Sequence, residues 1–493
     1  MRKTKGPSFV LTLKLNTNVR DEGILQERFF AGFLMYNSLV RHARGRLSGM
    51  RQDPRYRKAM QEYVGIKGTS PEDKRRRNEV SVTLRDIRQE YGLSEDQFHA
   101  WIAVSQHRYC KKIDSLTAQK IATRVWQAVE TVLFRKGKSV HFQKFDRFLS
   151  LEGKNNASGI RFSHGRMEWL GLSIQPQIRE GDDYAREAMA YRVKYCRITR
   201  KAMGISWHYY LQLVLEGAPP EKHRILPEGR VGIDPGTATE AVASESGCIL
   251  TELAPERKDI SATVRRLQRS QDRSRKACNP GNYNPDGTVK ARGQRKKWLS
   301  SKRSRETAMR LRTVRRRNAD TVKQSEERLV NEILSHHGSD IFTEKMDYKA
   351  LQAKAKEASV DETTGRFRSR KRFGASLAGH APSRFLTILE RKLSYAGKTV
   401  QYVDTWKFRA SQYDHVSGTY EKPKLSERWK DIGGHAVQRD LYSAFLLMNA
   451  KDPEHPDREM CLNAFPGFLK NHDACILRIK NNAASKPSSF GIA

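Results

Sequence analysis

Three acidic residues in the second half of the chain could together do phosphodiester chemistry. Asp234 follows the short apolar run RVGI and precedes a Pro-Gly turn, so rigid backbone holds its carboxylate at the tip of a strand. Glu344 ends the segment DIFTE, and Asp440 lies in the first turn of the apolar helix pattern RDLYSAFLLMNA. Phosphodiester hydrolysis by two Mg²⁺ ions needs converging hard carboxylate oxygens, with positions left for water and substrate. The three residues therefore predict catalytic and metal-binding roles.

Each acid also has an ordinary structural explanation. Asp-Pro-Gly is a frequent turn, a glutamate often ends a strand, and an aspartate at a first helical turn can cap the helix. The joint pattern favours chemistry, because two central strands and a following helix can bring such carboxylates together in an RNase H-like fold. Asp347, three residues after Glu344, is either an outer member of this site or a solvated loop residue.

The elements that must position these acids change in character along the chain. Apolar residues recur at helical spacing within 21–137, where Ser94 and Gln97 form a capping-box pattern. From 138 to 217 the period becomes two, which predicts short strands of a small β-barrel that the first strand could join. The proline-rich segment 216–230 predicts a linker. The acids follow it, in a third region.

The charge of the chain points to a polyanionic partner. The 493 residues include 92 Lys and Arg against 55 Asp and Glu, a net charge of +37 spread over the whole length. Such an excess binds phosphate backbones by counterion release. No apolar run is long enough to span a membrane, and no basic amphipathic helix with a clean apolar face is evident. These features predict nucleic-acid partners and no membrane association.

One stretch concentrates this charge. Between Ala291 and Arg317 there are twelve Lys and Arg residues and one acid, Glu306. A helix here would be positive on nearly all sides, and a bound nucleic acid would relieve its self-repulsion. The predicted contacts are Arg295, Lys296, Lys297, Lys302, Arg303, Arg305, Arg310, Arg312, Arg315, Arg316 and Arg317.

Cysteine usage and the amino terminus indicate a reducing compartment. The six cysteines form no C-x-x-C pair, so neither a disulfide framework nor a cysteine zinc site is expected. The first residues alternate Leu11, Leu13 and Leu15 with polar residues, which predicts a strand rather than a signal peptide. We therefore expect a cytoplasmic protein, and a chain of this positive charge would associate there with the nucleoid.

The segments GIDPG, IFTEKMDYKAL and QRDLYSAFLLMN resemble the three RuvC motifs of TnpB, the RNA-guided nuclease of insertion sequences, and of compact type V CRISPR effectors. The likeness is best over roughly 228–450, where the intervening basic stretch resembles the family's paired basic helices. Whether the chain is closer to the transposon or the CRISPR branch stays open.

The resemblance implies an α/β plus α+β, bilobed organisation. It assigns 1–20 and 138–225 to a wedge-type β-barrel and 21–137 to a helical recognition domain. The RuvC nuclease domain would comprise 226–410 and 435–493, with a basic helical insertion at 258–335. The remaining segment, 411–434, would be a degenerate zinc-finger-like, nucleic-acid-binding piece.

In that last segment the family carries four zinc-binding cysteines, but here the four places hold Asp414, Ser417, Lys430 and Gly433. No zinc is therefore expected, and His415, a lone imidazole in a loop, is expected at the surface. Tyr413, Tyr420 and Trp429 could pack the segment without metal.

By resemblance, the activity would be RNA-guided DNA cleavage by a monomer within its ribonucleoprotein. The partners would be a guide RNA, double-stranded target DNA beside a short adjacent motif, and the displaced single strand. The cofactors would be two Mg²⁺ ions, for which Mn²⁺ could substitute. Two alternatives stay open: an RNA-guided DNA-binding regulator without cleavage, and a guide-independent RNase H-like transposase or resolvase.

Overall fold

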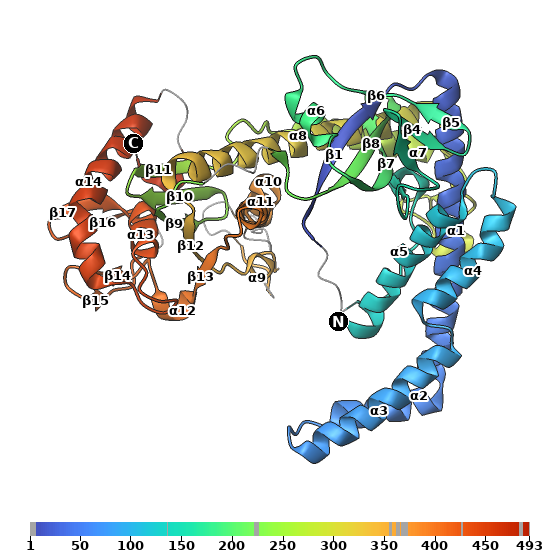
Figure 1. Ribbon diagram of the computed structural model, residues 1–493, viewed down its shortest axis with the longest axis horizontal. Coiled ribbons are helices and arrows are strands. Elements are labelled where there is room, and N and C mark those ends of the chain that lie inside the picture. Colours follow the sequence, from blue (N-terminus) through green and yellow to red (C-terminus); the bar gives the residue numbers. More distant parts are fainter. Residues whose placement is uncertain are drawn as a thin grey trace. The chain divides into compact units, whose positions relative to one another are not determined.

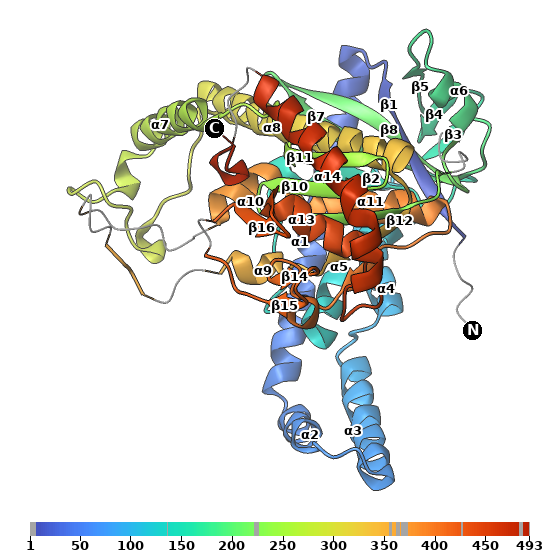
Figure 2. The same ribbon diagram turned by 90° about the vertical axis from the view of Figure 1, so that its left-hand side faces the viewer.

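The computed structural model describes residues 6–135, 137–220, 226–353, 357–360, 365, 373–424, 427–482 and 487–492. The chain divides into two compact units, Met1–Pro220 and Glu221–Ala493. The division falls inside the segment predicted as a linker. Figures 1 and 2 show the elements of each unit from two directions.

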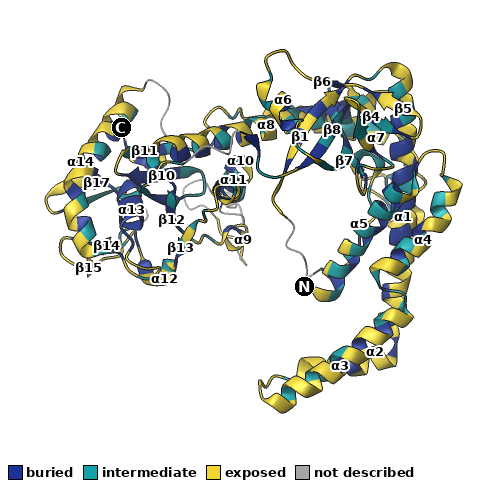
Figure 3. Ribbon diagram, in the orientation of Figure 1, coloured by how far each residue is buried: buried dark blue, intermediate teal, exposed yellow. Residues whose placement is uncertain are grey.

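Helices dominate the first part of the first unit. Its five longer helices are α1 (Val19–Gln52), α2 (Pro54–Gly65), α3 (Pro71–Glu90), α4 (Glu95–Arg108) and α5 (Ser115–Phe134). The predicted cap is confirmed, because the Ser94 hydroxyl accepts a hydrogen bond from the Gln97 N–H at the start of α4. Only Ala59, Val80 and Leu84 are buried between α2 and α3, which Figure 3 shows as mostly exposed.

The strands of the first unit form two antiparallel sheets. One has the order β2-β7-β8-β1-β6 and the other β3-β4-β5. Their bounds are β1 Ser8–Leu15, β2 Ser150–Glu152, β3 Arg161–Ser163, β4 Arg166–Trp169, β5 Leu172–Ile174, β6 Pro176–Gln177, β7 Val193–Met203 and β8 Ser206–Glu216. A short helix, α6 (Asp183–Ala188), precedes β7.

The first strand joins the larger sheet as predicted, with Phe9, Leu11, Leu13 and Leu15 buried on alternate positions. The predicted β-barrel is wrong for the described residues. The strands β2 and β6 are the free edges of the larger sheet, and β3, β4 and β5 pair only with one another across tight turns. Residues 140–142 begin the region in which alternation predicted short strands, but they lie outside every strand.

The second unit is built on a mixed five-stranded sheet of order β11-β10-β9-β12-β13. The strands β9 (Arg230–Pro235), β10 (Thr239–Ser244) and β11 (Gly247–Glu252) form an antiparallel meander. β12 (Asp340–Glu344) runs parallel to β9, and β13 (Gln401–Val403) parallel to β12. The carboxyl ends of three neighbouring strands therefore meet at one edge.

Helices cover both faces of this sheet. α13 (Arg439–Met448) and α14 (Arg458–Asn481) bury one face, and α8 (Lys302–Glu332) and α11 (Pro382–Tyr395) bury the other. α7 (Ser261–Cys278) pairs with α8. The shorter elements are α9 Tyr348–Leu351, α10 Gly374–His380, α12 Thr405–Phe408, β14 Tyr413–Asp414, β15 Thr419–Tyr420, β16 Trp429–Ile432 and β17 His435–Gln438. No helix in the described ranges is both long and apolar enough to cross a bilayer.

Candidate functional site at the carboxyl edge of the second sheet

Asp234 and Glu344 lie side by side on adjacent parallel strands. The register pairs Ile233 of β9 with Thr343 of β12, so the next residue on each strand is one of the two acids. Strand alternation turns both side chains to the face covered by α13, because Phe342 packs into the core on that face. The strand-end positions predicted for both residues are confirmed.

The helix α13 brings Asp440 to the same face. It lies directly on β9 at Gly232, where a Cβ atom would come within 1.8 Å of the Ala444 carbonyl oxygen and 2.4 Å of the Met448 nitrogen. Only glycine permits this approach. Asp440 is not the cap of the helix: the Gln438 side chain accepts the hydrogen bond from the Leu441 N–H. The ordinary explanation for Asp440 is therefore removed.

The three carboxylates repel one another. Burial raises the pKa of Asp234 well above its usual range, and the neighbouring charges of Glu344 and Asp440 raise it further, against smaller opposing effects of Arg439 and Ser443. Burial also raises the pKa of Glu344 to about 7. Like charges held together at a partly buried edge are a feature of functional sites, since a stable fold has no need of them.

Two arginines that the sequence reasoning missed contact Asp440. The Arg439 Nε and Nη2 atoms each lie 3.3 Å from Asp440 Oδ1, and Arg428 Nη1 lies 4.0 Å from Oδ2. Arg439 Nη1 also donates to the Glu427 carbonyl oxygen at 2.8 Å. Arg439 thus ties the chain before β16 to Asp440. Its position next to the acid in the QRD string was the available signal.

The donor set suits Mg²⁺ by its chemistry. Among the described residues no three His, Cys, Asp or Glu side chains converge tightly enough to enclose one metal ion. Mg²⁺ does not need such a cage, because it keeps several waters and takes one or two carboxylates together with substrate phosphate oxygens. Hard oxygens on adjacent strands and a facing helix fit that requirement. Asp347 caps α9 by accepting hydrogen bonds from the N–H groups of Lys349 and Ala350.

A second group of buried acids lies on the opposite face of the sheet and was also missed. Glu240 of β10 is fully buried, and neither of its carboxylate oxygens has a hydrogen-bond partner. Burial raises its pKa well above the usual range, and Asp234 and Glu326 add to that shift. Glu326 of α8 accepts from Arg384 Nε at 2.5 Å. Burial next to Glu240 also raises the pKa of Tyr348.

The predicted basic stretch is only partly helical. Arg295, Lys296 and Lys297 precede α8, which begins at Lys302 after the cap Ser301. The helix is not exposed and positive on all sides, because its first part buries Thr307, Met309, Leu311 and Thr313. The exposed members of the predicted set are Arg295, Lys296, Lys297, Lys302, Arg303, Arg305, Arg310, Arg315 and Arg317. Arg312 and Arg316 are half-buried, and Arg316 pairs with Asp320 at 2.6 Å.

The segment 411–434 folds around a histidine predicted at the surface. That prediction is wrong: His415 is fully buried, and its Nδ1 lies 2.8 Å from the Tyr442 hydroxyl of α13. Its ring packs edge-on against Phe445 and Phe465. Burial lowers the pKa of His415, so the neutral ring is favoured. This aromatic cluster braces the segment. One of its members, Tyr442, lies two residues after Asp440 on α13.

Comparison with known proteins gives structural likeness alone. No protein-family model matches the chain, and no curated protein matches its sequence. The chain is similar to a solved Cas12f1–sgRNA–target DNA complex chain, with a TM-score of 0.41 and 10% identity over 90% of this chain and 99% of the other. A CRISPR–Cas12f ternary complex gives a TM-score of 0.24 and 10% identity over 87% and 81%.

Proposed function

We propose that the chain is an RNA-guided DNA endonuclease whose RuvC-type site uses Asp234, Glu344 and Asp440. The observation that carries the proposal is the meeting of these three acids on one face of the sheet, from β9, β12 and α13. Their mutual effect on the pKa of Asp234 supports a shared site. Two adjacent central strands and a facing helix are the supports that an RNase H-like nuclease requires.

In this proposal the carboxylates of Asp234, Glu344 and Asp440 would hold Mg²⁺. When bound, the two ions supply an activated water and stabilise the leaving oxygen. The chain's own residues hold the carboxylates in place: Gly232 sets the approach of α13, and Arg439 orients Asp440. Bound metal would also offset the repulsion among these partly buried acids.

RNA guidance rests on the charge of the chain and on the family resemblance. A net charge of +37 and the exposed arginines and lysines before and along α8 are suited to phosphate backbones. Sequence choice would then lie in base pairing between the RNA and the target. The helical part of the first unit would take the recognition role and its strands the wedge role.

The test is cleavage of plasmid DNA by the protein purified with its RNA. Asp234→Asn should abolish Mg²⁺-dependent cleavage while RNA and target binding stay within about threefold, because phosphate contacts dominate affinity. Normal cleavage by this variant would refute the site. Cleavage by protein stripped of RNA would instead favour a guide-independent transposase or resolvase.

One observation favours a second function, RNA-guided DNA binding without cleavage. Arg439 and Arg428 both contact Asp440 and could hold it away from metal. A regulator of this kind would bind RNA and target but would leave DNA uncut at every Mg²⁺ or Mn²⁺ concentration. The wild-type protein in the same plasmid assay separates the two functions.

A further inference from the structure

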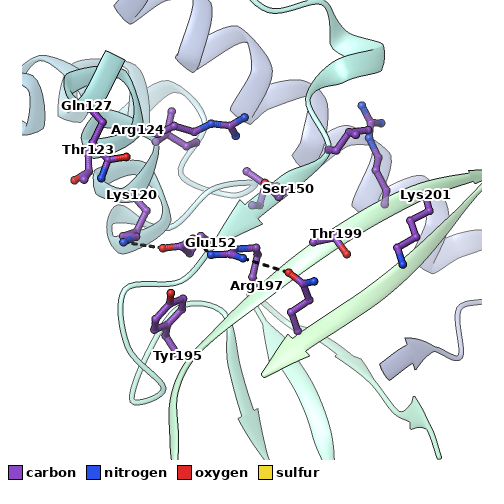
Figure 4. A pocket seen from close by; sticks show the side chains of 15 residues that line it. Lys120, Thr123, Arg124, Gln127, Ser150, Glu152, Tyr195, Arg197, Thr199 and Lys201 are labelled. Carbon is purple, nitrogen blue, oxygen red and sulfur yellow. Dashed lines mark hydrogen bonds and ion pairs between the residues drawn. The ribbon is translucent and has the colours of Figure 1, made fainter. Parts of the chain in front are cut away.

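A polar pocket in the first unit, far along the chain from the three acids, is unexplained by the cleavage site. It has a volume of about 780 Å³ and lies between α5 and the strands β2, β7 and β8. Figure 4 shows its lining side chains. Polar residues make up most of the lining: Lys120, Thr123, Arg124, Gln127, Ser150, Glu152, Tyr195, Arg197, Thr199, Arg200, Lys201 and Gln212.

Two regular elements present these groups. Lys120, Arg124 and Gln127 follow one another at helical spacing, so they share one side of α5. On β7 the side chains alternate: Cys196 and Ile198 are buried in the core, while Tyr195 and Arg197 turn to the pocket. The positions are set by backbone that is itself held in the core, so the groups stand ready without rearrangement.

The charge of the pocket is unbalanced. Glu152 pairs with Lys120 at 2.7 Å and with Arg197 at 2.6 Å, and it is the one acid among the lining residues. Within the described part of the chain, Arg124 and Lys201 have no carboxylate partner: Arg124 lies over the rings of Tyr36 and Phe148, and Lys201 over Tyr210. The pocket therefore favours an anionic ligand.

The remaining lining groups narrow the ligand. Amides and hydroxyls of Gln127, Gln212 and Thr199 can exchange hydrogen bonds with base edges or a ribose 2′-hydroxyl. Tyr195 supplies a ring, with Lys120 Nζ 5.7 Å from its centre. A volume of this size lies within the range of about 300–1,000 Å³ typical of small-ligand pockets. It admits a splayed-out nucleotide, the form in which proteins read single-stranded RNA.

We propose that this pocket binds a short unpaired segment of the accompanying RNA, with a phosphate near Lys201 and Arg124 and the base of another nucleotide of the segment against Tyr195. The proposal rests on the proposed function only in requiring an RNA partner. It does not require DNA cleavage, so the two can fail separately.

The first test measures binding of a fluorescent single-stranded RNA decamer to the full chain carrying Asp234→Asn, at several salt concentrations. Lys201→Gln should weaken binding and reduce the slope of log K against log salt by about 0.7, the value for one phosphate contact to a single strand. Lys67→Gln is the matched control, since Lys67 is an exposed lysine between α2 and α3 outside the pocket. An unchanged slope for Lys201→Gln would overturn the phosphate assignment.

The second test concerns the ring. Tyr195→Ala should weaken RNA binding about tenfold through loss of base stacking, whereas Tyr195→Phe should keep most of the affinity. Ultraviolet crosslinking of the co-purified RNA should label a peptide containing Tyr195. Equal affinity of Tyr195→Ala and Tyr195→Phe, at unchanged thermal stability, would contradict the proposal.

A DNA decamer of the same sequence gives the remaining arm. We expect it to bind several-fold more weakly than RNA, because it lacks the 2′-hydroxyl. DNA binding equal to or tighter than RNA binding would overturn the assignment to RNA. If these binding tests succeed but the wild-type protein does not cut plasmid DNA, then the assignment of the pocket stands and the proposed nuclease activity is refuted.

Discussion

Both faces of the second unit's sheet carry acidic residues, but the acids lie at an open edge on one face and are fully covered on the other. On the α13 face, Asp234, Glu344 and Asp440 gather at the carboxyl edge, and all three keep part of their surface exposed. On the α8 face, Glu240 and Glu326 are wholly covered. Burial is the largest cause of the raised pKa of Asp234, and equally of that of Glu240.

The difference lies in what the acids can reach. Arg384 pairs with Glu326 and closes that face, where a single unpaired carboxylate, Glu240, can stay protonated. On the other face three carboxylates are grouped, and the arginines contact only Asp440. Burial alone therefore does not mark a site. Several like charges with an open edge do, because a cation from solvent can still enter.

The largest expected effect is a difference in cleavage rate between two variants, each of which neutralises one glutamate on one face of the sheet. Glu344→Gln should lower Mg²⁺-dependent DNA cleavage by at least about 10²-fold, the scale lost when one electrostatic contributor to a transition state is removed. Glu240→Gln, the same change on the other face, should leave the cleavage rate within about threefold. The measurement is the single-turnover rate on plasmid at saturating protein.

This pair is decisive in either direction. If Glu240→Gln loses as much activity as Glu344→Gln, then the acids on the α8 face belong to the site and the distinction between faces fails. If neither variant loses activity, then Glu344 is a structural strand-end residue. Far-ultraviolet circular dichroism of both variants checks that the fold is retained.

Substitution of one arginine on each face should affect different properties: Arg384 mainly the stability of the fold, and Arg439 mainly the rate of cleavage. Arg384→Met should reduce the free energy of unfolding by about 3 kcal/mol, because it leaves the buried Glu326 carboxylate without its partner. Arg439→Met should cost only about 1 kcal/mol, since Asp440 keeps contact with water, but should slow cleavage about tenfold. Urea denaturation and the plasmid assay measure the two quantities.

Glu326→Gln combined with Arg384→Met is the control for the first variant and should recover part of the lost stability. Arg439→Lys is the control for the second: it keeps the charge but not the forked contact to Asp440 and the Glu427 carbonyl, so it should not restore activity fully. A stability loss at Arg439 as large as that at Arg384 would make Arg439 a structural residue.

Sequence reasoning found the acids on the α13 face because local patterns mark them. A short apolar strand ending at Asp234 or Glu344 and an apolar helix beginning at Asp440 are visible from neighbouring residues alone. That the ends of β9 and β12 meet at one edge of the sheet depends on the long connection between β11 and β12. Only the structure supplies the register, in which Ile233 pairs with Thr343. The linker, being local in composition, was also predictable.

Features that depend on distant partners were missed or wrong. Glu240 follows a turn like any polar strand residue, and its burial comes from α8 and α11, which lie far away in sequence. His415 is covered by Tyr442, Phe445 and Phe465, none of them a neighbour in sequence. The β-barrel failed for a similar reason, since closure depends on how two edge strands meet and not on their alternation.

The smallest effect concerns pH and the α8 face. The pKa of Glu240 is raised in the folded chain, so the stability associated with its protonated form is complete below the ordinary glutamate pKa and is lost as the pH rises through the raised value. Gln cannot titrate. Glu240→Gln should therefore gain stability over the wild type as the pH increases from about 5 to about 9.

Thermal unfolding of the metal-free protein across this range measures the gap, and Glu357→Gln, at an exposed glutamate of the same unit, is the control that should follow the wild type. Because Asp234 also raises the pKa of Glu240, Asp234→Asn should narrow the gap. Parallel unfolding curves for the wild type and Glu240→Gln would mean that Glu240 reaches solvent or a counter-ion. The acids on the α8 face would then be open to solvent like those on the α13 face, and solvent access would no longer distinguish the two faces.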